Sequence, residues 1–290
     1  MLAHYNLDPF SVDDNGNTPL HAAAISGWEE AVRLLVNKYN CPIDCRNNHN
    51  KTPLFFACKH GHLNIVRMLL SKLKTNTTTC RKSKEWHEET DILIGDLNSR
   101  GYNGRTILHQ ACQAGDVELA ENLLQLYCNS LSVDDNGETP LHYAVRGGHE
   151  GVAKLLITKY NFSVNCRNNG GQTPLHTACS YSNINVVKML AFDCKADLKV
   201  PDKGNETPLH VAVRCGKSDI AKYLMNEFNC SSIINHKGLE GRTLLHDACS
   251  TYVYESELIE TLLTHYRADP LSNDDNGNVP LHYAAAKGRK

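Results

Sequence analysis

The chain has 290 residues, 41% apolar and 21% charged, a balance typical of a folded protein rather than a disordered one. Its formal net charge of −2 and pI near 6.7 argue against a general binder of nucleic acid or anionic membranes, which needs a basic excess. No apolar run approaches the roughly 18 residues of a membrane span, and the start lacks the pattern of a secretory signal.

One motif recurs along the chain, beginning at a Thr that precedes Pro-Leu-His or a close variant. Its copies start at Thr18, Thr52, Thr106, Thr139, Thr173, Thr207, Thr243 and a substituted Val279. Most starts are 33 to 36 residues apart, and the step from Thr52 to Thr106 is 54. Periods in the low thirties indicate stacked supersecondary units.

The fourth copy shows why each unit predicts two short helices. Gly137 closes a turn, and Thr139 and Pro140 suit the N-cap and the first position of a helix. Apolar residues then recur at the i, i+3, i+4 spacing of a helical face in two successive stretches, 141–145 and 152–156. Each helix is too short to be stable alone, so stacking on neighbouring copies must supply the burial.

The sequences TPLHAAA (18–24), TPLHYAV (139–145), TPLHTAC (173–179) and TPLHVAV (207–213) resemble the ankyrin repeat. The resemblance extends over nearly the whole chain. It implies an all-α fold: an ankyrin-repeat solenoid of helix-turn-helix units joined by β-hairpin loops. The expected array comprises a partial repeat tail (1–12), repeats 1 to 7 (13–46, 47–73, 99–133, 134–167, 168–201, 202–237 and 238–273), an insertion (74–98) and a partial repeat 8 (274–290).

The long second step contains a polar segment, residues 74–95, that fits no copy of the motif. Repeats 1–3 and 4–7 correspond in order, with the copy at Thr207 lacking a counterpart in the first group. We therefore interpret residues 74–95 as the remainder of a lost repeat. Its ILIGDL stretch (92–97) is expected to keep one packed helical turn.

The chemistry-bearing residues mostly repeat with the motif. His21, His109, His142, His176, His210, His246 and His282 share one position, with Phe55 in the second copy. An active site is normally built once, so seven copies favour an imidazole that bridges a Thr hydroxyl and backbone groups. Cys58, Cys112, Cys179 and Cys249 likewise share one position and are interpreted as small core residues.

Signals for metal binding or catalysis are weak. Cys58, His60 and His62 form the most metal-like cluster, but no second pair at zinc spacing accompanies them. The chain has no phosphate loop, nucleophile elbow or dinucleotide fingerprint. The sequence therefore predicts no enzyme, cofactor or metal. The twelve cysteines of this long, unsignalled chain are expected to be reduced thiols in the cytoplasm.

The remaining candidate is a surface. In ankyrin proteins the hairpin tips and first helices line a concave face that binds partners. The matching candidate residues are Lys51, Lys59, His60, Tyr102, Arg105, Gln113, Asp135, Glu138, Arg146, Gln172, Tyr181, Glu206, Arg214 and Arg242. Their mixed charges favour a protein or peptide over a polyanion, and Tyr102 and Tyr181 are the expected aromatic anchors.

These observations predict a monomeric protein-interaction scaffold that binds a protein or peptide, with no nucleic-acid partner and no membrane insertion. The alternative is a regulatory or targeting segment of a larger enzyme or signalling protein, because the chain begins and ends inside a repeat. A third interpretation makes the array a substrate of asparagine hydroxylation, with Asn165 near the place that the resemblance implies.

Overall fold

The computed structural model describes residues 8–77, 93–126, 131–181, 183–251 and 256–288. For residues 74–77 it describes the backbone alone. The chain falls into two compact units, Met1–Asp135 (unit 1) and Asn136–Lys290 (unit 2). All regular elements of the described residues are helices, and none of these residues is in a strand. The predicted all-α class is confirmed, whereas the repeat boundaries given above stay predictions.

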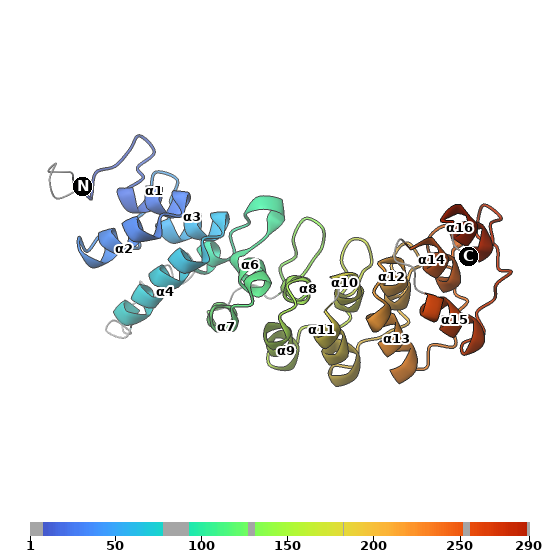
Figure 1. The fold of residues 1–290 in the computed structure, drawn as a ribbon. Coiled ribbons are helices and arrows are strands. Elements are labelled where there is room, and N and C mark those ends of the chain that lie inside the picture. Colours follow the sequence, from blue (N-terminus) through green and yellow to red (C-terminus); the bar gives the residue numbers. More distant parts are fainter. Residues whose placement is uncertain (1–7, 78–92, 127–130, 182, 252–255, 289–290) are drawn as a thin grey trace. The chain divides into compact units, whose positions relative to one another are not determined.

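Unit 1 carries helix pairs joined by turns. They are α1 (Pro19–Ser26) with α2 (Glu29–Asn37), α3 (Pro53–His60) with α4 (Leu63–Thr77), and α6 (Ile107–Ala114) with α7 (Val117–Gln125). Residues 93–97 form a further helical turn, and the short 3₁₀ helix η2 (Tyr102–Gly104) lies in the connection before α6. The helices of each pair pack together, α1 packs on α3 and α2 on α4 (Figure 1).

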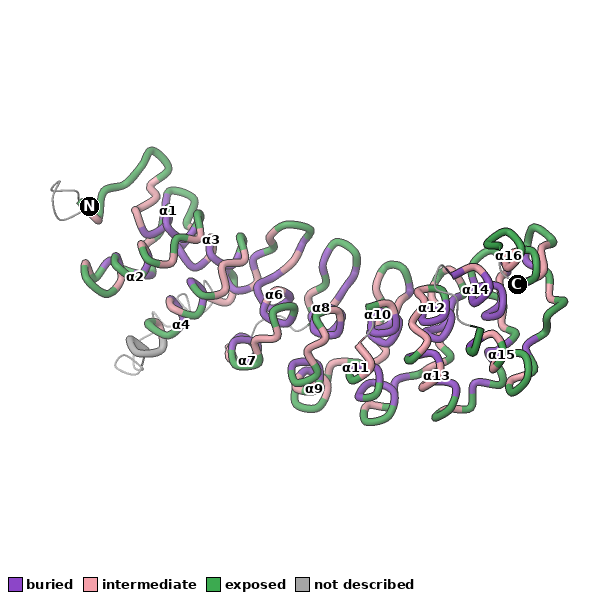
Figure 2. Tube along the Cα trace, in the orientation of Figure 1, coloured by how far each residue is buried: buried purple, intermediate pink, exposed green. Residues whose placement is uncertain are grey.

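Unit 2 repeats the same arrangement. Its first helices are α8 (Pro140–Arg146), α10 (Pro174–Tyr181), α12 (Pro208–Arg214), α14 (Leu244–Ser250) and α16 (Pro280–Ala286). Its second helices are α9 (Glu150–Thr158), α11 (Ile184–Lys188) with the π-helical η3 (Met189–Asp193), α13 (Ser218–Glu227) and α15 (Ser256–Thr264), and η4 (Leu239–Gly241) precedes α14. Successive first helices stack on one another, and those before α16 are largely buried, as the purple α10, α12 and α14 show in Figure 2.

The motif residues explain this stacking. In the fifth copy, Thr173 precedes Pro174 at the helix start, and the Nδ1 atom of His176 accepts a hydrogen bond from the Thr173 N–H at 3.1 Å. The other ring nitrogen, Nε2, then carries the proton and donates it to the Glu206 carbonyl of the next connection at 3.0 Å. The predicted structural role of the repeated imidazole is confirmed, because it ties one copy to the next.

The second copy has Phe55 in place of the bridging histidine. Phe55 cannot bridge, and its N–H donates to the Thr52 hydroxyl oxygen at 3.2 Å. The Thr52 hydroxyl donates in turn to the buried carboxylate of Asp96, next to the fully buried Leu97. Residues 93–97 are thus a packed helical turn, as the ILIGDL stretch predicts. Residues 78–92 lie outside the described residues, so the lost-repeat interpretation stays a hypothesis.

Lowering the pH from about 7 to about 5 should destabilise the fold. Burial lowers the pKa of His21, His176 and His210, the last to about 4, whereas an unfolded histidine titrates near 6.5. In this window these histidines bind protons in the unfolded chain but not in the folded chain. The contribution of these histidines to the free energy of unfolding is therefore fully present above about pH 6.5 and decreases as the pH falls. For His210 alone the loss at about pH 5 is roughly 2 kcal/mol.

The measurement is the urea midpoint of the wild type and of His210→Gln at both pH values. Comparing the two chains removes the contribution of the other titrating groups. The midpoint of the wild type should fall more steeply with pH than that of the variant. Equal pH slopes would show that His210 is not held neutral by its burial. His49→Gln, at an exposed position, is the control and should keep the wild-type slope.

Candidate partner-binding surface

Unit 1 contains a pocket of about 560 Å³ between the end of α3, the η2 connection and α6. It is lined by Lys59, His60, Gly101, Tyr102, Arg105, Gln110 and Gln113. Five of the residues predicted from the repeat pattern (Lys59, His60, Tyr102, Arg105 and Gln113) thus come together at one place. Gly101 and Gln110 were not predicted.

Backbone geometry builds this pocket. Helix α3 ends at Gly61, which has the positive φ of 77° that glycine tolerates. The connection before α6 is closed by a hydrogen bond from the Gly101 N–H to the Arg105 carbonyl at 2.8 Å. A Cβ atom at Gly101 would lie 2.2 Å from the Lys59 carbonyl oxygen, so only glycine lets the connection lie against the end of α3. Tyr102 is then presented with 84% of its surface exposed.

The pocket has a positive electrostatic character. Lys59 and His60 occupy the last turn of α3, where the helix dipole favours cations. Burial, then the neighbouring His62 and Lys59, lower the pKa of His60, so its ring is neutral near pH 7. The ammonium groups of Lys51 and Lys59 lie 4.3 Å and 5.8 Å from the centre of the Phe55 ring. Lys51 therefore adds its charge next to the pocket.

The remaining predicted residue of unit 1, Asp135, lies on an exposed turn away from the pocket lining. Its Oδ1 atom accepts a hydrogen bond from the Arg100 guanidinium at 2.9 Å. The same turn is joined to the preceding connection by a bond from the Asp135 N–H to the Asn103 carbonyl at 3.0 Å. Asp135 therefore helps to hold two connections together.

In unit 2 the predicted charged residues pair with one another inside the chain. Glu206 is only 4% exposed, and its carboxylate accepts from Nε and Nη2 of Arg214 at 2.8 Å and 2.9 Å. Glu138, 6% exposed, accepts from Nη2 of Arg146. In both pairs the glutamate precedes the N-cap threonine and the arginine ends the same helix. The pattern alone does not show that these charges are compensated.

The other predicted residues of unit 2 are arranged as follows. Tyr181 is 55% exposed at the end of α10, and the Arg146 guanidinium lies 5.4 Å from its ring centre. Gln172 is half-buried and accepts weakly from the Asn168 amide at 3.4 Å. Arg242 pairs with the carboxylate of Asp247 at 2.5 Å and lies 5.0 Å from the ring centre of Tyr283.

Asp247 is a buried acid that the sequence analysis did not single out. Burial raises its pKa to about 6, and the adjacent Arg242 opposes the shift. The available signal was its position in the repeat, where the equivalent residues are Tyr143 and Val211 and only this copy has an acid. Its role is to pair with Arg242 beneath the surface.

A family model described as "Ankyrin repeats (3 copies)" matches residues 1–79, 84–168 and 158–234. The chain belongs to the ankyrin-repeat family. Ankyrin-repeat domains are generally protein–protein interaction modules and are typically non-catalytic. The resemblance drawn from the TPLH motifs is thereby confirmed.

Individual ankyrin relatives are moderately similar. The chain is 30% identical over 176 residues to a probable 26S proteasome regulatory subunit, p28, of Saccharomyces cerevisiae. The match covers 55% of this chain and 77% of that protein. It is 30% identical over 145 residues to the human transient receptor potential cation channel subfamily A member 1, covering 50% of this chain and 11% of the channel. The structure of the human ASB11 ankyrin repeat domain superposes with a TM-score of 0.58 and 22% identity, covering 85% of this chain and 97% of that domain.

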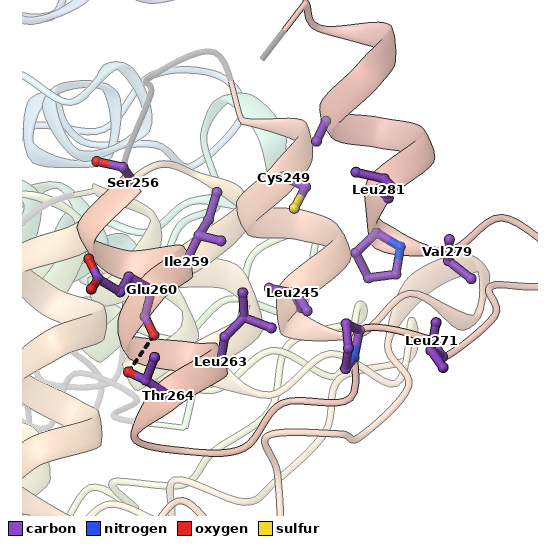
Figure 3. A pocket seen from close by; sticks show the side chains of 13 residues that line it. Leu245, Cys249, Ser256, Ile259, Glu260, Leu263, Thr264, Leu271, Val279 and Leu281 are labelled. Atoms are coloured by element: carbon purple, nitrogen blue, oxygen red, sulfur yellow. Dashed lines mark hydrogen bonds between the residues drawn. The ribbon is translucent and has the colours of Figure 1, made fainter. Parts of the chain in front are cut away.

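A second cavity, of about 600 Å³, lies among α14, α15 and α16 of unit 2. Figure 3 shows its mainly apolar lining, with Leu245, Leu263, Leu271 and Leu281 among the side chains. Leu281 is 72% exposed, whereas the same leucine of the other seven ankyrin copies is at most 3% exposed. Leu281 thus occupies the position that the following copy covers elsewhere in the array, and none of the described residues buries it.

Other kinds of site find little support in the described part of this ankyrin chain. No group of three or more His, Cys, Asp or Glu side chains there is placed to hold a metal ion, and this includes Cys58, His60 and His62. No helix among the described residues is long and apolar enough to cross a membrane. Cys58, Cys112, Cys179 and Cys249 are buried core residues, as their shared position predicts.

Proposed function

We propose that this ankyrin-repeat chain is a protein-interaction scaffold, monomeric and cytoplasmic, that binds a partner protein or peptide through its hairpin tips and first helices. The unit 1 pocket is the centre of the binding surface. The observation that supports this is the convergence of five candidate residues, from two copies of the repeat, on one pocket of about 560 Å³. Its size falls within the roughly 300–1,000 Å³ range of ligand sites in proteins.

Tyr102 is the expected anchor of this surface. An exposed, rigid aromatic ring offers a partner a large contact area at low entropic cost, and tyrosine is enriched in binding hot spots. The candidate residues of unit 2 are assigned a smaller part, because Arg146 and Arg214 are already paired with Glu138 and Glu206. A partner that recruited these arginines would have to break a stable ion pair.

Tyr102→Ala should weaken partner binding by about 2 kcal/mol, roughly 30-fold, and leave the folded chain intact. The partner is replaced by short random peptides displayed on phage and selected on the immobilised chain. Peptides that survive selection are then titrated against the wild type and the variant. The matched control is Trp28→Ala, which removes another exposed aromatic side chain of unit 1, 65% exposed, outside the pocket lining.

Loss of binding in Tyr102→Ala but not in Trp28→Ala supports the proposal. Failure to select any peptide, or equal binding by both variants and the wild type, would overturn it. Circular dichroism of both variants should match the wild type, because surface substitutions of this kind change stability by no more than about 0.5 kcal/mol.

A second candidate function is that of a regulatory or targeting segment of a larger protein. The observation that favours it is the share of each relative that is matched. The chain corresponds to 11% of the human cation channel and 14% of mouse Rabankyrin-5, so arrays of this kind occur within longer chains. Both candidates use the same surface, and the peptide selection tests that surface in either case.

A further inference from the structure

The unit 1 pocket brings cations together without an acid among its lining residues. Lys59 comes from the end of α3 and Arg105 from the η2 connection, and the ammonium of Lys51 lies over the same Phe55 ring as that of Lys59. Within the described residues, no carboxylate lies at ion-pair distance from Lys59. The acids closest in the repeat pattern are engaged elsewhere: Asp96 accepts from Thr52, and Asp135 pairs with Arg100.

The Phe55 ring is contacted by both lysines. The same position holds histidine in the other seven copies. Its aromatic ring attracts the ammonium groups of both Lys51 and Lys59, at 4.3 Å and 5.8 Å. Two like charges on one ring repel each other, and an anion placed beside them relieves that repulsion. Phenylalanine in place of the repeated histidine at position 55 therefore creates a local preference for negative charge.

At the end of α3, backbone N–H groups donate hydrogen bonds to the helix carbonyl groups. The Cys58 carbonyl accepts from the Gly61 N–H at 3.2 Å, and the Ala57 carbonyl from the His62 N–H at 2.9 Å. The helix end is thus capped by backbone, and the exposed ammonium of Lys59 faces the pocket. This ammonium is available to a ligand together with the amide group of Gln110.

We propose that this pocket recognises a carboxylate of the partner: a peptide segment with Asp or Glu beside an apolar or aromatic residue. The carboxylate accepts charge-assisted hydrogen bonds from Lys59 and Arg105, and the neighbouring residue packs on Tyr102. This inference rests on the proposed function and specifies its partner. A nucleic acid fits less well, because it needs cations spaced along its backbone rather than gathered at one pocket.

The test uses peptides selected on the wild-type chain, each synthesised in three forms. One form keeps its acidic residues, one replaces them by Asn or Gln, and one replaces them by Lys. Fluorescence anisotropy gives the affinity of each form for the wild type, for Lys59→Glu and for the control Lys38→Glu, at an exposed site outside the pocket lining. A single-stranded oligonucleotide of matched length is titrated alongside.

For the wild type and Lys38→Glu, the acidic form should bind about tenfold or more tighter than the amide form. Lys59→Glu should lose this preference or shift it toward the Lys form. Lys59→Met serves if the reversed charge prevents folding, and it should also lose the preference. Salt should weaken the acidic form more than the amide form.

Equal affinity of the acidic and amide forms, with binding still lost in Tyr102→Ala, would overturn the carboxylate inference while leaving the proposed function standing. Binding that no longer depends on Tyr102 would instead overturn the proposed function. An oligonucleotide that binds more tightly than the acidic peptide, and in a Lys59-dependent way, would also overturn the inference, in favour of a nucleic-acid partner.

Discussion

Replacing Arg214 by methionine is expected to lower the free energy of unfolding by about 3 kcal/mol. Methionine keeps most of the volume and the apolar stem of arginine, so the main loss is the charge. The Glu206 carboxylate, 4% exposed, would then be buried without its two hydrogen bonds from the guanidinium. Leaving one partner of a buried ion pair uncompensated costs far more than the pair itself contributes.

Urea denaturation followed by circular dichroism measures this loss. The matched control is Glu206→Gln, which removes the charge of the buried partner and leaves the half-exposed Arg214 free to reach water. It should cost only about 1 kcal/mol. A loss in Arg214→Met no larger than that of the control would show that the pair does not hold the connection before α12 against its helix.

Replacing His176 by alanine should destabilise the fold by about 3 kcal/mol. The buried Thr173 N–H and the Glu206 carbonyl would lose their shared partner, and the side chain would leave a small cavity. The same denaturation experiment checks this value. His282→Ala is the control, because this imidazole of α16 lies exposed and its only hydrogen bond among the described residues is the local one from the Val279 N–H.

The control should cost less than about 1 kcal/mol. Similar losses for His176→Ala and His282→Ala would contradict the account in which the imidazole links successive copies. Phe55 is consistent with that account, since the second copy replaces the missing bridge by the hydrogen bond between Thr52 and Asp96. Asp96→Ala should therefore lower the stability of unit 1, where the bridging histidine is absent.

The fold could be predicted from the sequence because the motif specifies each copy locally. In most copies a threonine followed by proline starts the first helix, a buried leucine and alanine follow at helical spacing, and a glycine or asparagine closes the turn. Eight repetitions remove the ambiguity that a single short helix would leave. Even the packed turn at residues 93–97 was predictable from its apolar residues, Leu97 among them.

The pairing of charges was harder to predict. Glu206 and Arg214 are eight residues apart, a spacing that no helix brings together. They meet because the extended residues before the N-cap run back along the helix that follows. The same separation in Glu138 and Arg146 was the available signal, and only the folded geometry explains it. Gly101 was missed for a similar reason, since its contact with the Lys59 carbonyl joins two copies.

The central claim, that partners bind at the pocket of Lys59, Tyr102 and Arg105, is tested most directly by a crystal structure of the chain with a selected peptide. The account predicts a peptide carboxylate within hydrogen-bonding distance of Lys59 or Arg105 and a neighbouring side chain packed on the Tyr102 ring. A peptide seated in the apolar cavity among α14, α15 and α16, or on the second helices, with the unit 1 pocket empty, would contradict it.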